Sequence, residues 1–217
     1  MLASQTTVLA TVGSAAALIG ALMLARGRVQ RHARFHWRSE HVSDSGVKVV
    51  MRSACMSDMK TLFAQIYALA VLHEEEDELL TTEASIASAF AAGSFHCLLI
   101  TLAATGEVIG SAIFQDSFRT WSGPSLYLQD LIVDADHRGN GLGTLVMRTL
   151  AAVALARGCD RMFWESHASN QKAYSFYATT IGAETLTGAH QLLTWKLIGV
   201  DKLTALSRAA LGRAFRA

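Results

Sequence analysis

Proline, cysteine and charge are all scarce in this chain. Its 217 residues include one proline and three cysteines, and only 17% of them are charged, whereas 51% are apolar. An odd number of widely spaced cysteines predicts no disulfide framework and fits a reducing compartment. The cysteines and histidines show no ligand spacing, so we expect no metal centre. The apolar content suits one compact domain with a sizeable core and excludes a disordered chain.

Charge of each sign is missing from a different part of the chain. No charged residue precedes Arg26, and the segment from Arg26 to Arg38 holds five arginines and no acid. From Lys48 to Ile198 there are 10 basic and 15 acidic residues. An acidic domain between basic flanks argues against nucleic acid as a partner and favours cationic ligands.

The N-terminal segment contains a long apolar run. Val8 to Ala25 is an 18-residue stretch that is polar only at Ser and Thr. As a helix it would span about 27 Å, close to the hydrocarbon thickness of a bilayer. The arginines that follow predict a cytoplasmic C-terminal side. We therefore expect a single-pass anchor over 1–25 and a basic juxtamembrane linker over 26–46, with a cleaved targeting peptide or a buried helix as alternatives.

Hydrophobic patterning over 47–198 predicts one mixed α/β domain with a central sheet and flanking helices. The expected strands are Val47–Met51, Cys97–Leu102, Val108–Phe114, Leu126–Val133, Arg161–Glu165 and Leu192–Leu197. One expected helix begins near Ser57. The others cover Ser85–Ala91, Leu142–Arg157 and Gln171–Thr180. Residues 199–217 form a basic amphipathic tail, for which a membrane surface, the domain itself or a dimer partner are all possible contacts.

A glycine-rich turn stands between a predicted strand and a predicted helix. It reads Arg138-Gly139-Asn140-Gly141-Leu142-Gly143-Thr144. Glycines allow close backbone approach, and a helix N-terminus offers N–H groups and partial positive charge, so this turn suits a pyrophosphate. The spacing differs from the dinucleotide-binding pattern, and no lysine follows as in a P-loop. A plain tight turn is the remaining alternative.

With this turn, the chain resembles the GNAT superfamily of N-acetyltransferases over Val47 to Leu197. Within it, the chain looks like the diamine (spermidine/spermine) N-acetyltransferase branch. The matching segments are Phe95-His96-Cys97-Leu98, Trp121-Ser122-Gly123, Tyr127-Leu128-Gln129-Asp130, and Asn170 followed by Phe176-Tyr177 and Gly182-Ala183.

The resemblance implies a GNAT fold, acetyl-CoA as the acetyl donor, and a homodimer. It also implies three groups of cofactor-binding residues. The first contacts the pantetheine arm and the carbonyl, the second holds the pyrophosphate, and the third touches the far part of CoA. They are Leu131, Ile132 and Val133; Arg138, Gly139, Asn140, Gly141, Leu142, Gly143 and Thr144; and Asn170, Gln171, Lys172 and Ala173.

Two positions are implied to be catalytic. Tyr177 matches the general acid of the family, and a phenol suits protonation of a leaving thiolate. Gln129 stands where the branch has a glutamate that relays the proton of the amine, and an amide does not accept that proton. Asp130 would point to the opposite face of a regular strand, unless a bulge re-aims it.

The predicted acceptor is a small cationic amine. The acidic run Glu74–Glu78 falls where the branch carries acids near the substrate amines, and it would attract a polycation. The expected substrate contacts are Glu74, Glu75, Glu76, Asp130, Trp164 and Glu165. A diamine or polyamine is the first choice of acceptor, and a thialysine-like amino acid or another small amine is the second. A membrane-bound acyl-CoA-binding protein without activity is the alternative from another class.

Overall fold

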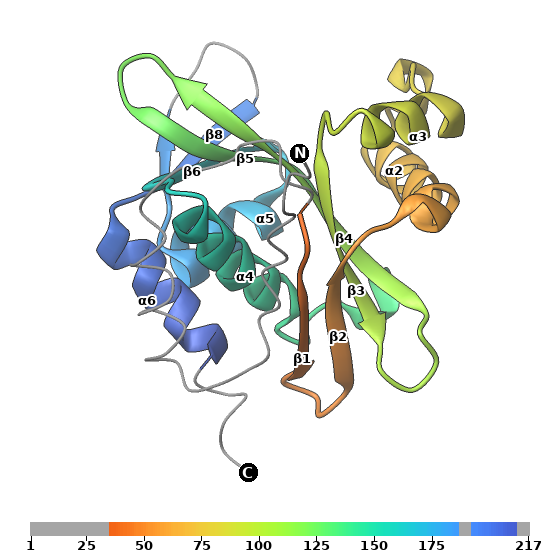
Figure 1. The fold of residues 1–217 in the computed structure, drawn as a ribbon, viewed down its shortest axis with the longest axis horizontal. Coiled ribbons are helices and arrows are strands. Elements are labelled where there is room, and N and C mark those ends of the chain that lie inside the picture. Colours follow the sequence, from red (N-terminus) through yellow and green to blue (C-terminus); the bar gives the residue numbers. More distant parts are fainter. Residues whose placement is uncertain (1–34, 187–191, 212–217) are drawn as a thin grey trace, which may run out of the picture.

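The computed structural model describes residues 35–186 and 192–211 of the chain, which form one eight-stranded sheet with helices on both faces (Figure 1). The strand order is β1-β2-β3-β4-β5-β6-β8-β7. Every neighbouring pair is antiparallel except β5 and β6, which run parallel. The strands are β1 (Arg38–Val42), β2 (Lys48–Ser53), β3 (His96–Leu102), β4 (Val108–Arg119), β5 (Gly123–Val133), β6 (Arg161–His167), β7 (Glu184–Leu186) and β8 (Leu192–Ile198).

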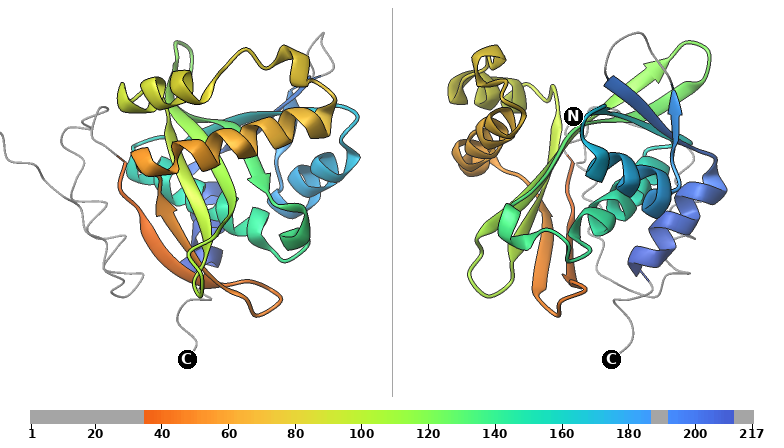
Figure 2. Two further views of the ribbon diagram at one scale, coloured as in Figure 1. Left: turned by 90° about the vertical axis from the view of Figure 1, so that its right-hand side faces the viewer. Right: turned by 180° about the vertical axis from the view of Figure 1, so that it is seen from behind.

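Helices α2 and α3 cover one face of the sheet, and α4, α5 and α6 lie on the other (Figures 1 and 2). Their bounds are α2 (Met59–His73), α3 (Glu83–Ala91), α4 (Leu142–Ala156), α5 (Gln171–Ser175) and α6 (Val200–Leu211). Short 3-10 turns cover Met56–Asp58, Glu76–Glu78 and Ala135–His137, and a π-helix, η4, covers Phe176–Ile181. None of the described helices is both long and apolar enough to cross a bilayer, and the predicted anchor over 1–25 lies outside the described residues.

Successive side chains of the central strands point to opposite faces of the sheet and contribute to two hydrophobic cores. In β3, Leu98 and Ile100 belong to the large core under α4, whereas Cys97 and Leu99 belong to a smaller core with Met59 and Leu62 near α2. A strand buried on both faces shows a continuous apolar run, as the Cys97–Leu102 segment does. The candidate active site lies where this sheet opens between β5 and β6.

All the predicted strands and helices of the domain are present, and their ends are extended or shifted by a few residues. Two strands, β1 and β7, were missed. The segment predicted as linker contains β1, which pairs with β2 from Arg38↔Arg52 to Val42↔Lys48. The domain therefore begins before Val47. The polar sequence of β1, whose residues are half-buried or exposed in alternation, gave no apolar run to recognise.

The C-terminal tail packs on the domain over the described part of its length. Leu203 of α6 is fully buried and Ser207 is also buried, while Leu206 packs against the large core under α4. Of the alternatives left open by the sequence, docking on the domain is the one observed for Val200–Leu211. The domain thus extends past Ile198 to include α6, because the apolar stripe of the helix completes the core beside α4.

Candidate active site

The sheet opens between β5 and β6 close to the middle of both strands. Their parallel pairing covers Leu126↔Met162, Tyr127↔Phe163 and Leu128↔Trp164, and then it ends. β5 continues to Val133 and β6 to His167 without pairing to each other. Backbone groups on this side of β5, including the predicted pantetheine-binding residues Leu131, Ile132 and Val133, are therefore not used by a neighbouring strand.

A β-bulge sits in β5 beside this opening. Ile113 of β4 pairs with Asp130 and Phe114 pairs with Leu128, which leaves Gln129 as the extra residue. The bulge changes which face each side chain occupies. Leu128 and Leu131 both pack on the α4 side, although three positions separate them.

The bulge turns Asp130 toward the face covered by α2. Burial raises the pKa of the Cys97 thiol, which lies on that face, and the Asp130 carboxylate adds to the rise. Of the two orientations that the sequence left open for Asp130, the one re-aimed by a bulge is therefore observed. Gln129 itself is exposed, and Asp130 is half-buried.

Asp130 belongs to a group of polar side chains on this face. Burial raises its pKa to about 6. The neighbouring phenol, Tyr127, has a raised pKa because of burial first and then because of the Glu165 carboxylate, to which it is hydrogen-bonded, and of Asp130. The Asp130 carboxyl, with a pKa of about 6, can hold an ammonium group and accept its proton, and the exposed Glu165 carboxylate, bonded to the neighbouring Tyr127, adds negative charge on the same face.

Tyr177 lies on the opposite face. It is buried on the π-helix η4, with its ring centroid 5.2 Å from that of Trp164 and 5.4 Å from that of Trp195. Burial raises the pKa of its hydroxyl, so the proton stays on the phenol at neutral pH. The sequence-predicted acid and the re-aimed Asp130 therefore flank the opening between β5 and β6 from two sides.

Trp164 and Glu165 were predicted together as substrate contacts, but they face opposite ways. Glu165 is exposed on the Tyr127 side, whereas Trp164 is 1% exposed and packs with Tyr177 in the core under α4. Successive residues of a strand alternate between faces, so the two cannot line one surface. Trp164 belongs with Tyr177 and not with the acidic side chains.

The glycine-rich turn forms the N-terminus of α4 as predicted. Gly139 and Gly141 have φ values of 78° and 74°, in the left-handed region that favours glycine, and Gly141 is the N-cap. The helix has no side-chain cap and no acid in its first turn. Arg138 donates from Nε to the carbonyl of Val133 at 2.7 Å, which ties the turn to β5. The N–H groups at this helix N-terminus suit a diphosphate, and contact of the turn with CoA stays a prediction.

A residue that the sequence analysis missed lies against this turn. Asp44, in the connection between β1 and β2, donates its backbone N–H to the carbonyl of Asn140 at 3.1 Å. A Cβ built on Gly141 would overlap the Asp44 carboxylate, so that carboxylate lies directly beside the N-cap of α4. No local sequence motif indicates that Asp44 lies close to Gly141, because the two residues are far apart in the sequence and come together only in the folded domain.

The other predicted CoA contacts stand at the start of α5. Asn170 is its N-cap, and its Oδ1 accepts the N–H of Ala173 at 3.0 Å. Gln171 donates from Nε2 to the carbonyl of Ala168, and Lys172 is exposed. Asn170, Gln171 and Ala173 thus have structural roles here, and their contact with CoA stays a prediction.

The acidic run follows α2 and is exposed throughout. Glu74 ends the helix with a left-handed backbone at φ 58°, and Glu76–Glu78 form a 3-10 turn. The ring of His73, just before the run, lies 6.1 Å from that of His167 at the end of β6. The run therefore begins next to a strand that borders the opening, and contact of Glu74, Glu75 and Glu76 with a substrate stays a prediction.

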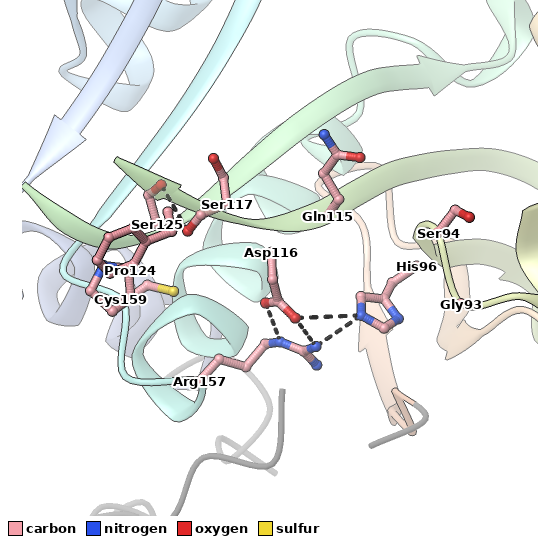
Figure 3. A pocket seen from close by; sticks show the side chains of 11 residues that line it. Gly93, Ser94, His96, Gln115, Asp116, Ser117, Pro124, Ser125, Arg157 and Cys159 are labelled. Carbon is pink, nitrogen blue, oxygen red and sulfur yellow. Dashed lines mark hydrogen bonds and ion pairs between the residues drawn. The ribbon is translucent and has the colours of Figure 1, made fainter. Parts of the chain in front are cut away.

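A polar pocket near the tip of the β4–β5 hairpin is separate from this site (Figure 3). Arg157, just after α4, forms a two-pronged ion pair with Asp116 of β4 and lies 2.8 Å from His96 Nε2. Burial alone would raise the pKa of Asp116, but hydrogen bonds from His96 and Arg157 hold it well below its usual range. This cluster fastens the C-terminal end of α4 to β3 and β4.

Comparison with known proteins agrees with this geometry. The model of the acetyltransferase (GNAT) family matches residues 57–183. The bovine (Bos taurus) thialysine N-epsilon-acetyltransferase is 32% identical over 149 residues, which cover 65% of this chain and 87% of the relative. A human (Homo sapiens) spermidine/spermine N(1)-acetyltransferase-like protein is 28% identical over 98 residues, 43% of this chain and 14% of the relative.

The fold is also shared with solved structures. The GNAT domain of S. lividans PAT superposes with a TM-score of 0.61 at 16% sequence identity, and the match covers 75% of this chain and 97% of that one. Such low identity speaks for the fold alone. Together with the match of the family model over more than half of the sequence, it leads to one conclusion: the chain belongs to the acetyltransferase (GNAT) family and is an N-acetyltransferase that uses acetyl-CoA as its acetyl donor.

Proposed function

We propose that this enzyme acetylates the terminal amine of a small cationic acceptor, and that Asp130 takes the part expected of a carboxylate at position 129. The observation that carries the proposal is the bulge at Gln129, which turns Asp130 toward Tyr127 and the α2 face. A basic amino acid of the thialysine type stands ahead of a polyamine, because the thialysine-acetylating relatives are more similar and match over more of the chain.

The proton transfers follow from the two faces of the opening. Acetyl-CoA, when bound, supplies an acetyl group activated as a thioester. On the α2 face, Asp130 accepts a proton from the acceptor ammonium and so leaves a neutral, nucleophilic amine. On the α4 face, Tyr177 donates its phenolic proton to the departing thiolate. The second proton that the nitrogen loses on acetylation returns the phenol to its neutral form, and the proton on Asp130 passes to solvent.

The surrounding side chains orient the acceptor. The Tyr127 phenol lies near Asp130 and is hydrogen-bonded to Glu165, so the three side chains offer a cation two carboxylates and a phenol on one face of the strand. The exposed run Glu74–Glu78 adds negative potential beside the entrance and raises the local concentration of cations. Gln129 points to solvent from the bulge and takes no proton in this scheme.

An acceptor panel tests this proposal. CoA release from acetyl-CoA would be measured for the full-length chain with thialysine, lysine, putrescine and spermidine in separate reactions. Asp130→Asn should lower kcat/KM by about a hundredfold or more and should remove the dependence on a group that titrates near pH 6. Tyr177→Phe should lower kcat by a similar factor, because it removes the phenolic proton that the departing thiolate takes up.

The matched variant is Gln129→Glu. If Asp130 is the base, a carboxylate at the exposed position 129 should change kcat/KM by less than about threefold. If the native enzyme lacks a base, the same carboxylate should raise kcat/KM by a large factor. A large gain with Gln129→Glu, or full activity of Asp130→Asn, would contradict the assignment. A preference for putrescine or spermidine over the amino acids would reverse the order of acceptors while leaving the base in place.

Membrane attachment and dimerisation are separate proposals. The apolar run and the arginines after it support an anchor over 1–25, with the catalytic domain on the cytoplasmic side, and the family resemblance supports a homodimer. Recovery of the full-length chain in the membrane fraction after alkaline wash, and loss of that recovery when residues 1–25 are removed, would test the anchor. Light scattering of the detergent-solubilised chain would test the dimer.

A further inference from the structure

A buried hydrogen-bond donor on the Tyr177 face has no acceptor in the part of the chain that the structure describes. Trp164 is 1% exposed, and its indole Nε1 has no hydrogen-bond partner among the described residues. Leaving such a donor unpaired in the interior is unfavourable, because the group loses its hydrogen bond to water and gains none in return. Native structures seldom keep such a donor unless water, a ligand or a catalytic role accounts for it.

A neighbouring tryptophan shows what a purely structural indole looks like here. Trp195 pairs with Trp164 across β6 and β8 and is fully buried as well. Its ring also packs on Tyr177, at 5.4 Å between centroids against 5.2 Å for Trp164. However, Trp195 donates from Nε1 to Ser166 Oγ at 2.8 Å. The two side chains differ mainly in whether the indole N–H is satisfied.

Trp164 lies at the point where the opening in the sheet begins. Trp164 is the last residue of β6 that pairs with β5 before the two strands separate. Its ring contacts Tyr177 at a tilt of 56°, without a hydrogen bond between them. Tyr177 is the group that meets the thioester sulfur in the reaction above. The carbonyl oxygen of the thioester is bonded to the carbon that carries this sulfur.

We propose that the Trp164 indole N–H donates a hydrogen bond to the thioester carbonyl oxygen of bound acetyl-CoA, which makes Trp164 a catalytic residue beside Tyr177. Oxygen is the better acceptor in a thioester, because sulfur accepts hydrogen bonds weakly. A fixed donor on this oxygen orients the acetyl group and withdraws electrons from its carbonyl carbon. The inference rests on the use of acetyl-CoA and on the proposed role of Tyr177, but not on the identity of the acceptor amine or on the role of Asp130.

Binding without any acceptor amine tests the proposal. The affinity of the full-length chain would be measured by calorimetry for acetyl-CoA and for S-ethyl-CoA, a thioether that lacks the carbonyl oxygen. Trp164→Phe should weaken acetyl-CoA binding by about fivefold to tenfold and leave S-ethyl-CoA within about twofold. Trp195→Phe is the matched control, and it should change the affinity for the two ligands by equal factors.

Equal losses for both ligands with Trp164→Phe, or no loss for either, would overturn the proposal. A measurement on the unaltered chain covers the case in which Trp164→Phe fails to fold. In a ¹⁵N–¹H spectrum, the Trp164 indole proton should move downfield on addition of acetyl-CoA and stay in place with S-ethyl-CoA, because hydrogen bonding deshields the proton. An indole signal that responds alike to both ligands would also overturn it.

Discussion

Burial raises the pKa of Asp130 to about 6 from its usual value of 3.8, and this single shift has opposite effects on activity and on stability. The charged form is needed to hold an ammonium and to accept its proton, so activity should rise as pH rises through 6. The same charged form is disfavoured by burial. Between about pH 4 and pH 6 the native state binds more protons than the unfolded state, so stability falls as pH rises through that window.

Asp130→Asn should therefore stabilise the enzyme while it inactivates it. At pH 7.5 we expect the free energy of unfolding to rise by about 1–2 kcal/mol, an amount discounted for the partial exposure of the carboxyl. At pH 4 the two proteins should unfold alike. Urea denaturation at both pH values measures this. Asp136→Asn, which changes an exposed carboxylate after β5, should leave stability nearly unaltered, and an equal gain from it would point to net charge instead.

At the scale of the elements, the sequence predicted what local patterns determine. Apolar runs located the buried strands, and the glycine turn located the N-terminus of α4. The sequence left a bulge beside Asp130 open as an alternative but could not establish it, because the bulge depends on how β5 pairs with β4, and neither strand alone specifies that register. The π-helix that carries Tyr177 was likewise read as a continuous α-helix, since its side-chain pattern gives no sign of the wider turn.

The approach of Asp44 to the glycine turn is a second tertiary feature, and it leads to a prediction. A carboxylate beside the N-cap of α4 competes for the same N–H groups and partial positive charge that suit a diphosphate. Asp44→Asn should therefore tighten binding of acetyl-CoA by about twofold to fivefold, an effect expected to shrink at high salt. Calorimetric titration at low and high ionic strength measures it.

Asp77→Asn provides the control for Asp44, because it removes the same charge from an exposed 3-10 turn instead of from beside the N-cap. If this variant tightens binding as much as Asp44→Asn does, long-range charge accounts for the effect and the local contact does not. A weaker affinity in Asp44→Asn would mean that Asp44 supports the turn instead of competing with its ligand.

At the scale of the whole molecule, acid stability depends on carboxylates that are paired in the fold. Asp58 accepts two hydrogen bonds from Arg52, both at 2.8 Å, and one from the Cys55 N–H at 2.7 Å. Burial alone would raise its pKa, but the bonds from Arg52 and Cys55 lower it to about 2. This contribution is complete above the unfolded pKa near 4 and is lost as pH falls through 2.

Asp58→Asn should therefore lower the free energy of unfolding by about 1–2 kcal/mol at pH 7 and by much less near pH 2. Denaturation curves across this range would measure the loss. The exposed pair Arg38–Glu40, 3.9 Å apart, supplies a contrast, since Glu40→Gln should have almost no effect at either pH. A pH-independent loss in Asp58→Asn would indicate disrupted packing in place of a lost ion pair.

The limits of the folding unit depend on both ends of the described chain. Phe35 packs edge-to-face on Phe114 at 5.1 Å, Trp37 exchanges hydrogen bonds with Ser53, and β1 covers the edge of β2. At the other end, α6 buries Leu203 against the core under α4. Removing either segment exposes apolar surface that no other described element covers.

A chain cut to residues 47–198, the domain that hydrophobic patterning alone delimits, should therefore melt about 10 °C or more below one that spans 35–211. Chains over 35–198 and 47–211 separate the two contributions. Because Phe35 and Leu203 both pack on the large core under α4, the loss from the double truncation should differ from the sum of the single losses. Circular dichroism on heating measures all four, and equal melting temperatures would show that neither segment belongs to the folding unit.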